Sequence, residues 1–117
     1  MTRIKLALAA VAAASLVAAP ASQAATILVG TVGPGFTITL KSAGKTVKKL
    51  KKGKYVIRVS DKSNIHNFHL KGPGVNKLTS VGGTGLKTWT VTLKPGKYTY
   101  VCDPHASSMR GTFTVVA

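Results

Sequence analysis

The pattern of apolar and polar residues separates one unbroken apolar run near the start of the chain from a series of short alternating segments. The alternation is clearest where Trp89, Val91 and Leu93 fall on one face and threonines on the other, as in a half-buried β-strand. Segments of this kind, bounded by Gly, Pro, Asp or Lys, are predicted as strands at 26–32, 36–40, 55–59, 65–70, 88–93, 98–101 and 112–116. The Gly-rich stretch 72–85 is expected to be a long connection without a strand. The pattern predicts an all-β fold, a Greek-key β-sandwich of about seven strands.

Two turns share a Leu-Lys-x-Gly-Lys-Tyr pattern, at residues 50–55 and 93–98. In each, the glycine suits a tight turn and the tyrosine, Tyr55 or Tyr98, begins the next strand. A tyrosine in this position can return its hydroxyl to the backbone a few residues upstream, as in the tyrosine corner of sandwich folds. Common turn chemistry would also produce such a repeat, so the repeat indicates fold and not activity.

The apolar run covers residues 6–19, follows a basic start and is closed by Pro20. It is shorter than the roughly 20 residues that a helix needs to cross a bilayer. Small residues at 22 and 24 precede a cleavage point, so we interpret residues 1–24 as a secretory signal peptide and not as a retained membrane anchor. We therefore expect a secreted or periplasmic protein with one domain at residues 25–117.

Composition excludes several classes of site. The chain has one Cys, which rules out a disulfide framework and four-Cys metal sites, and its two carboxylates are too few for glycosidase chemistry with a pair to spare. The 17 Lys and Arg give a formal net charge of +15, so a macromolecular partner is expected to be acidic or polyanionic. A nucleic-acid partner is not expected outside the cell without a recognised module. Five lysines crowd one turn region: Lys48, Lys49, Lys51, Lys52 and Lys54.

Three metal donors lie in one short loop near the C-terminus: Cys102, His105 and Met109. Thiolate, imidazole and thioether together favour copper over magnesium or calcium. Pro104 stiffens this loop, and Gly111 is expected to permit a tight return into the last strand. The alternative is a buried cysteine that has an unrelated histidine and methionine nearby.

A trigonal blue-copper centre needs a second histidine, and His66 and His69 remain. They are three residues apart, so on a regular strand they point to opposite faces. His66 shares its face with Phe68 and Leu70 and is expected to point inward, whereas His69 shares its face with polar residues and is expected at the surface. The periodicity favours His66 as the donor, and a bulge near Asn67 would reverse the assignment.

With these residues in place, the sequence resembles the cupredoxins of the plastocyanin, pseudoazurin and amicyanin type. Residues 65–68, Ile-His-Asn-Phe, are similar to the first ligand segment of that family. Residues 100–105, Met109 and residues 111–115 are similar to its Cys-x-Pro-His loop and final strand. The resemblance implies one type 1 copper ion, with three equatorial ligands and one weak axial ligand: His66, Cys102, His105 and, axially, Met109. It also implies that Asn67 braces the ligand loop near Cys102.

Two features differ from the family pattern. Three residues separate His105 from Met109, where plastocyanins have four and amicyanins two, so the axial bond and the potential cannot be copied from either group. Asp103 stands where the family usually has Ser or Thr. A carboxylate so near the thiolate is expected to favour the oxidised metal and to lower the reduction potential.

The resemblance implies a small, monomeric one-electron carrier and not an enzyme, because protein donors fill the coordination positions. The electron would leave through the solvent edge of His105, beside Pro104 and Ala106. Its partner would be an acidic redox protein, such as a cytochrome, oxidase or reductase, reached by electrostatic steering. Attraction to an anionic envelope surface and a merely solvated lysine surface are the alternatives for the charge. Copper storage or delivery without a redox partner is the alternative function.

Overall fold

The structure is a computed structural model that describes residues 24–117, so the expected signal peptide lies outside the described residues except for Ala24. The strands are β1 Thr26–Val32, β2 Ile38–Ser42, β3 Lys45–Thr46, β4 Lys49–Lys51, β5 Gly53–Asp61, β6 His69–Gly72, β7 Val75–Leu78, β8 Gly85–Leu93, β9 Gly96–Val101 and β10 Arg110–Val116. One short 3₁₀ turn, η1 Asp103–His105, lies between β9 and β10. Among the described residues, no helix is long and apolar enough to cross a membrane.

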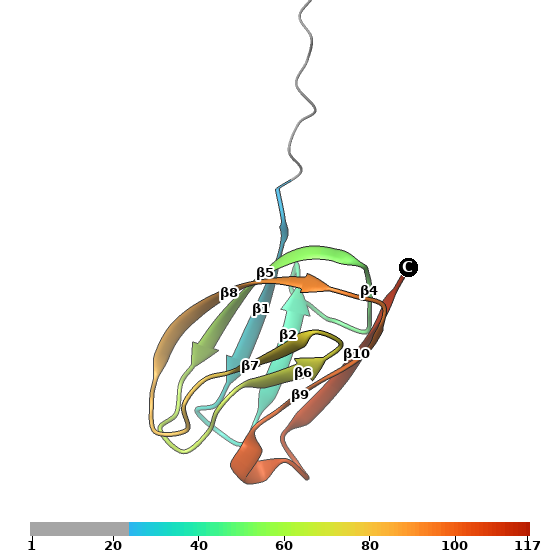
Figure 1. Cartoon of the computed structure of the whole chain (residues 1–117). Helices are drawn as coiled ribbons and strands as arrows, with labels where there is room; N and C mark the ends of the chain where they lie inside the picture. The colour runs from blue at the N-terminus through green and yellow to red at the C-terminus, as the bar shows by residue number, and fades with distance from the viewer. Residues whose placement is uncertain (1–23) are drawn as a thin grey trace, which may run out of the picture.

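The strands form two five-stranded sheets that pack face to face (Figure 1). One sheet has the order β3-β2-β1-β5-β8, and the other has the order β4-β10-β9-β6-β7. The pairs β1–β5 and β4–β10 are parallel, and the other neighbouring pairs are antiparallel. The predicted Greek-key β-sandwich is confirmed, with ten strands in place of about seven.

Period-two alternation builds the core between the sheets. In β5, Tyr55, Ile57 and Val59 are buried, whereas Lys54 and Arg58 between them are exposed. In the aromatic part of the core, the Phe68 and Tyr100 rings stack at 5.6 Å and the Tyr98 and Phe113 rings stack at 5.1 Å. Such stacked pairs add about 0.5–1.5 kcal/mol to the free energy gained from burial alone.

Gly111 has a different role from the one expected of it. It lies inside β10 and not in the preceding loop, and the Tyr100 ring occupies the space that a β-carbon would need. Its value is therefore close packing of an aromatic ring on the sheet, not a tight turn.

The two tyrosine corners are confirmed. The Tyr55 hydroxyl donates to the Lys51 carbonyl oxygen at 2.7 Å. The Tyr98 hydroxyl lies 3.1 Å from the Lys94 carbonyl oxygen and 2.9 Å from that of Pro73, and accepts from the Lys94 N–H at 3.0 Å. Gly53 and Gly96 take φ values of 147° and 143°, a region that favours glycine.

Two of the strand predictions are wrong. The stretch 72–85 contains β7, which pairs with β6 as a hairpin and buries Val75. Residues 65–68 are not a strand, since β6 begins only at His69. In this segment the Phe68 N–H donates to the Thr79 hydroxyl and the Thr79 N–H to the Phe68 carbonyl, so a loop contact replaces the sheet ladder.

The connections gather at two ends of the sandwich. Loops 33–37, 62–68, 79–84 and 102–109 meet at the end that we call the loop end, at the bottom of Figure 1. The turns near residues 52, 73 and 95, together with both ends of the described chain, lie at the opposite end, which we call the far end.

Candidate metal centre

Three potential metal donors come together at the loop end: His66, Cys102 and His105. The Nδ1 atoms of His66 and His105 are 3.1 Å apart, and each lies 3.6 Å from the Cys102 sulfur. His66 and Cys102 have no exposed surface, whereas His105 is partly exposed. The sequence-based choice of His66 over His69 as the neighbour of Cys102 therefore agrees with the arrangement in space.

Backbone hydrogen bonds hold the loop that carries two of these donors. The Cys102 N–H donates to the Met109 carbonyl at 3.0 Å, and the Met109 N–H donates to the His105 carbonyl at 2.8 Å. The His105 N–H in turn donates to the Cys102 carbonyl at 3.0 Å. The loop is thus closed on itself, and Met109, which is 1% exposed, is drawn into the interior at its end.

The donor separations fit one transition-metal ion. Metal bonds to imidazole nitrogen and thiolate sulfur are about 2.0–2.3 Å long. A triangle with edges of 3.1, 3.6 and 3.6 Å leaves a point near its centre at about that distance from all three atoms. Two imidazoles, one thiolate and a nearby thioether fit a single type 1 copper site.

His66 presents only one of its ring nitrogens to this cluster. Its other nitrogen, Nε2, is buried and has no hydrogen-bond partner among the described residues. A buried imidazole N–H without an acceptor costs free energy, so the ring is not held in place by its own hydrogen bonds. Its position comes from the loop around it and from contact with its neighbours.

Phe36 is a member of the site that the sequence analysis did not identify. Its ring is 65% exposed and meets the rings of both His66 and His105 edge-on, with centroids 5.0 Å apart in each case. The sequence analysis placed Phe36 in a strand, but β2 begins at Ile38. An aromatic residue directly after Gly33-Pro34-Gly35 was the available signal, because that composition favours an exposed loop.

His69 is buried and not at the surface as expected. It is 8% exposed, its Nδ1 lies 2.9 Å from an Asp103 carboxylate oxygen, and its Nε2 lies 2.6 Å from the Asn76 side-chain oxygen. Both ring nitrogens face acceptors, an arrangement that suits the protonated ring. The strand-parity argument fails because residues 65–68 leave the sheet, so His66 and His69 can both point inward.

Asn67 links the two segments that carry donors. Its side-chain oxygen accepts from the Asp103 N–H at 2.7 Å, and its amide nitrogen donates to the Asp103 carboxylate at 2.8 Å and to the Thr79 carbonyl at 3.3 Å. The bracing contact that the family resemblance implied for Asn67 is therefore present, next to Cys102.

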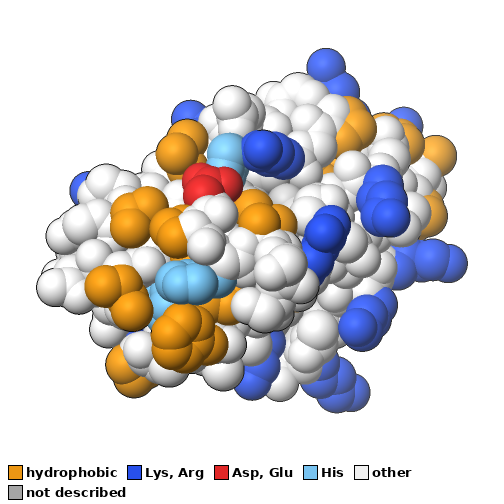
Figure 2. Space-filling view, turned by 90° about the horizontal axis from the view of Figure 1, so that it is seen from below, with side chains coloured by type: hydrophobic (Ala, Val, Ile, Leu, Met, Phe, Trp, Pro, Cys, Tyr) orange, Lys and Arg blue, Asp and Glu red, His pale blue; other side chains and the backbone are white. Residues whose placement is uncertain are grey.

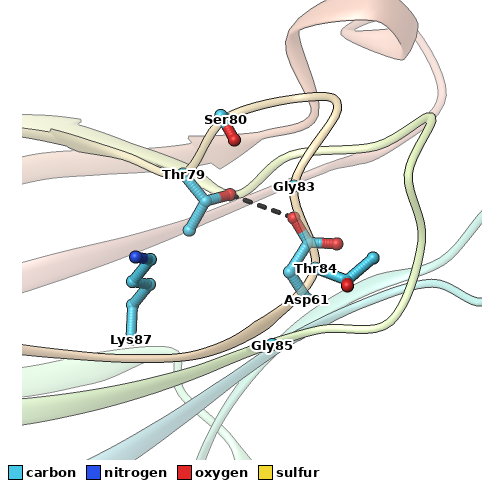
Figure 3. A pocket seen from close by; sticks show the side chains of 7 residues that line it. All are labelled: Asp61, Thr79, Ser80, Gly83, Thr84, Gly85 and Lys87. Carbon is cyan, nitrogen blue, oxygen red and sulfur yellow. Dashed lines mark hydrogen bonds between the residues drawn. The ribbon is translucent and has the colours of Figure 1, made fainter.

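Thr79 and Asp61 extend this link to the first sheet, and neither was singled out from the sequence. The Thr79 hydroxyl accepts from the Phe68 N–H at 2.9 Å and donates to the buried Asp61 carboxylate at 3.3 Å (Figure 3). The other Asp61 oxygen accepts from the Ser63 N–H at 3.1 Å. The loop that carries His66 is thus tied at Ser63, Asn67 and Phe68.

Asp103 is a paired carboxylate and not an isolated one. Partial burial raises the pKa of its carboxyl, but the hydrogen bonds from Asn67 and His69 and the positive charges of His69 and Lys71 outweigh this and hold the pKa below its usual value. Because the ion pair with His69 compensates its charge, Asp103 should lower a nearby reduction potential less than an unpaired carboxylate would.

The surface around His105 is largely apolar and carries little charge. Seen from the loop end, hydrophobic side chains surround a histidine, and the lysines and arginines lie mostly to one side (Figure 2). Phe36 and Ile65 are 65% and 51% exposed. The four loops at this end contain one lysine, Lys62. An apolar rim around a partly exposed imidazole is suited to close contact with another molecule.

The comparisons with known proteins agree with this site. The sequence profile described as copper binding proteins, plastocyanin/azurin family, matches residues 37–116. Among curated proteins, none matches the sequence significantly.

Several solved structures have the same fold. Reduced rusticyanin is similar with a TM-score of 0.59 and 20% identity, covering 77% of this chain and 78% of that one. Rusticyanin from Thiobacillus ferrooxidans has a TM-score of 0.57 and 22% identity, over 77% of this chain and 76% of that one. Reduced auracyanin from the photosynthetic bacterium Roseiflexus castenholzii has a TM-score of 0.56 and 19% identity, over 80% of this chain and 99% of that one.

Proposed function

Because the chain belongs to the plastocyanin/azurin family of copper binding proteins, we propose that it is an exported one-electron carrier with one type 1 copper ion. The ligands in this proposal are His66, Cys102 and His105, with Met109 as the weak axial ligand. The observation that carries it is the triangle of Cys102 sulfur and two Nδ1 atoms, in which Cys102 and His66 are wholly buried.

A bound copper ion supplies one-electron redox chemistry at this site. The protein's part is to keep its donors in one place in both oxidation states. The closed 102–109 loop, the Asn67 contacts and the Thr79–Asp61 link restrict movement of these donors. The buried faces of His66 and Cys102 exclude water, which favours electron transfer over binding and conversion of a substrate.

We infer that the electron passes through the edge of His105, the most exposed of the four ligands in this proposal. Phe36 and Ile65 provide an apolar surface beside it. An acidic redox partner would be attracted by the overall charge, but most lysines lie away from this surface. Docking at His105 is therefore expected to depend on apolar contact, with steering confined to the approach.

Copper storage or delivery is the second candidate, and the burial of the donors disfavours it. Exchange of a metal requires access to its ligands, and three of the four side chains are 1% exposed or less. The test is to load the exported protein with Cu(II) and to cycle it with ascorbate and ferricyanide. A carrier should lose and regain its colour reversibly with the copper retained. Release of copper on reduction would favour delivery.

A further inference from the structure

The repeated lysine-rich turns form one surface at the far end of the sandwich. Gly53 pairs with Leu93, so the two Leu-Lys-x-Gly-Lys-Tyr turns lie side by side although they belong to different parts of the chain. Lys49 and Lys97 flank Thr114 on neighbouring strands. The resulting basic end consists of seven exposed lysines: Lys48, Lys49, Lys51, Lys52, Lys54, Lys94 and Lys97.

No acidic side chain compensates this charge. The sequence contains two carboxylates, and both lie at the loop end: Asp61 closes β5 and is buried, and Asp103 is paired with His69. Charge is therefore segregated along the long direction of the sandwich. A redox partner that docks on His105 would not touch the basic end, so the proposed electron transfer does not account for it.

From this segregation we infer that the basic end binds the surface of an anionic lipid bilayer and leaves the loop end facing away from it. Clusters of four to eight basic residues bind anionic lipids, each residue strengthening binding roughly fivefold. The seven cations are all lysines and no arginine is among them. Lysine is a mobile point charge, whereas specific protein interfaces are enriched in arginine and depleted in lysine. Diffusing headgroups can adapt to such a surface without a shaped pocket.

The binding should be electrostatic and reversible. The two tyrosines of the repeated turns are buried, at 8% and 0% exposure for Tyr55 and Tyr98, so these turns offer no aromatic ring for insertion into the acyl chains. Raising the salt from about 0.1 M to about 1 M shortens the Debye length from about 10 Å to about 3 Å and should release the protein.

The test measures sedimentation of the exported protein with two kinds of vesicle, one of phosphatidylcholine alone and one with an equal amount of phosphatidylglycerol. Two variants of equal net charge are compared. The far-end variant carries Lys→Gln at five positions: Lys51, Lys52, Lys54, Lys94 and Lys97. The matched control carries Lys or Arg→Gln at five exposed positions elsewhere: Lys41, Arg58, Lys62, Lys77 and Lys87.

We expect the wild type to bind the phosphatidylglycerol vesicles and not the neutral ones. The far-end variant should bind on the order of a hundredfold more weakly, and the control variant less than about tenfold more weakly. An unchanged circular dichroism spectrum establishes that each variant is folded. Equal losses in both variants would mean a diffuse field and would overturn the proposal, as would equal binding to neutral vesicles. Tight, far-end-dependent binding of polyglutamate without vesicle binding would also overturn it and would indicate an acidic protein partner.

Discussion

At the far end of the sandwich, the Tyr98 hydroxyl lies within hydrogen-bond distance of three backbone atoms and Tyr55 within reach of one. At the loop end, by contrast, the Nδ1 atoms of His66 and His105 face each other and a buried thiol. Hydrogen bonding completes the first arrangement, and a metal ion would complete the second. We conclude that the far end stabilises the sandwich, whereas the loop end holds donors ready for a ligand.

The largest effect on both stability and colour is expected from Asn67→Ala. Asn67 is 1% exposed, and its loss leaves the Asp103 N–H and the Thr79 carbonyl without their partner. We expect a loss of about 3 kcal/mol in the free energy of unfolding, measured by urea denaturation of the apoprotein. The copper protein should also show a shifted visible band, because the loop next to Cys102 is released. An unchanged spectrum would contradict the bracing role.

Tyr98→Phe should change stability alone. The Lys94 N–H and the carbonyls of Lys94 and Pro73 lose the hydroxyl that they share, at a cost of about 1.5 kcal/mol. Tyr55→Phe removes a single hydrogen bond and should cost less, about 1 kcal/mol. In both variants the visible spectrum of the copper protein should stay as in the wild type. A spectral change in either would break the separation between the two ends.

Thr79→Val tests whether the link to Asp61 positions the His66 loop. The Phe68 N–H loses its acceptor, so its hydrogen exchange in the apoprotein should accelerate roughly fivefold. Copper should also dissociate faster than from Tyr98→Phe, although the losses of stability are similar. Thr79→Ser keeps the hydroxyl and should restore both rates. If Thr79→Val and Tyr98→Phe release copper equally, the link is structural only.

The smallest effects concern the ion pair of Asp103 and His69. Asp103→Asn should raise the reduction potential, because a negative charge near the copper favours the oxidised state. His69→Gln removes the compensating charge and should lower the potential. Each shift is expected to be about 40 mV or less, the equivalent of about 1 kcal/mol for one electron. Voltammetry of the two variants measures both signs, and shifts in the same direction would contradict the charge argument.

The parts of the fold that sequence could predict are those governed by local rules. Alternation located β1 and β8, and turn chemistry located both tyrosine corners. The 65–68 segment was wrong because its backbone bonds to Thr79, which no local pattern reveals. The burial of His69 depends on Asp103, 34 residues away. Such partners become visible only once both sheets are assembled.

The candidate site was predictable to a similar degree. Donor chemistry and spacing gave Cys102, His105 and Met109, and His66 was chosen by a parity rule that does not hold for that segment. Phe36, Thr79 and Asp61 carry no donor signature of their own. Their roles come from contacts across loops 33–37, 62–68 and 79–84, which are far apart in the sequence.

Titration of the exported protein with Cu(II), followed by visible absorption, tests the central claim most directly. We expect an intense band near the red end of the visible range that saturates at one copper per chain, as thiolate coordination in a type 1 site requires. Cys102→Ser should abolish the band while His69→Gln retains it. A folded wild type that stays colourless, or a band that persists in Cys102→Ser, would contradict the claim.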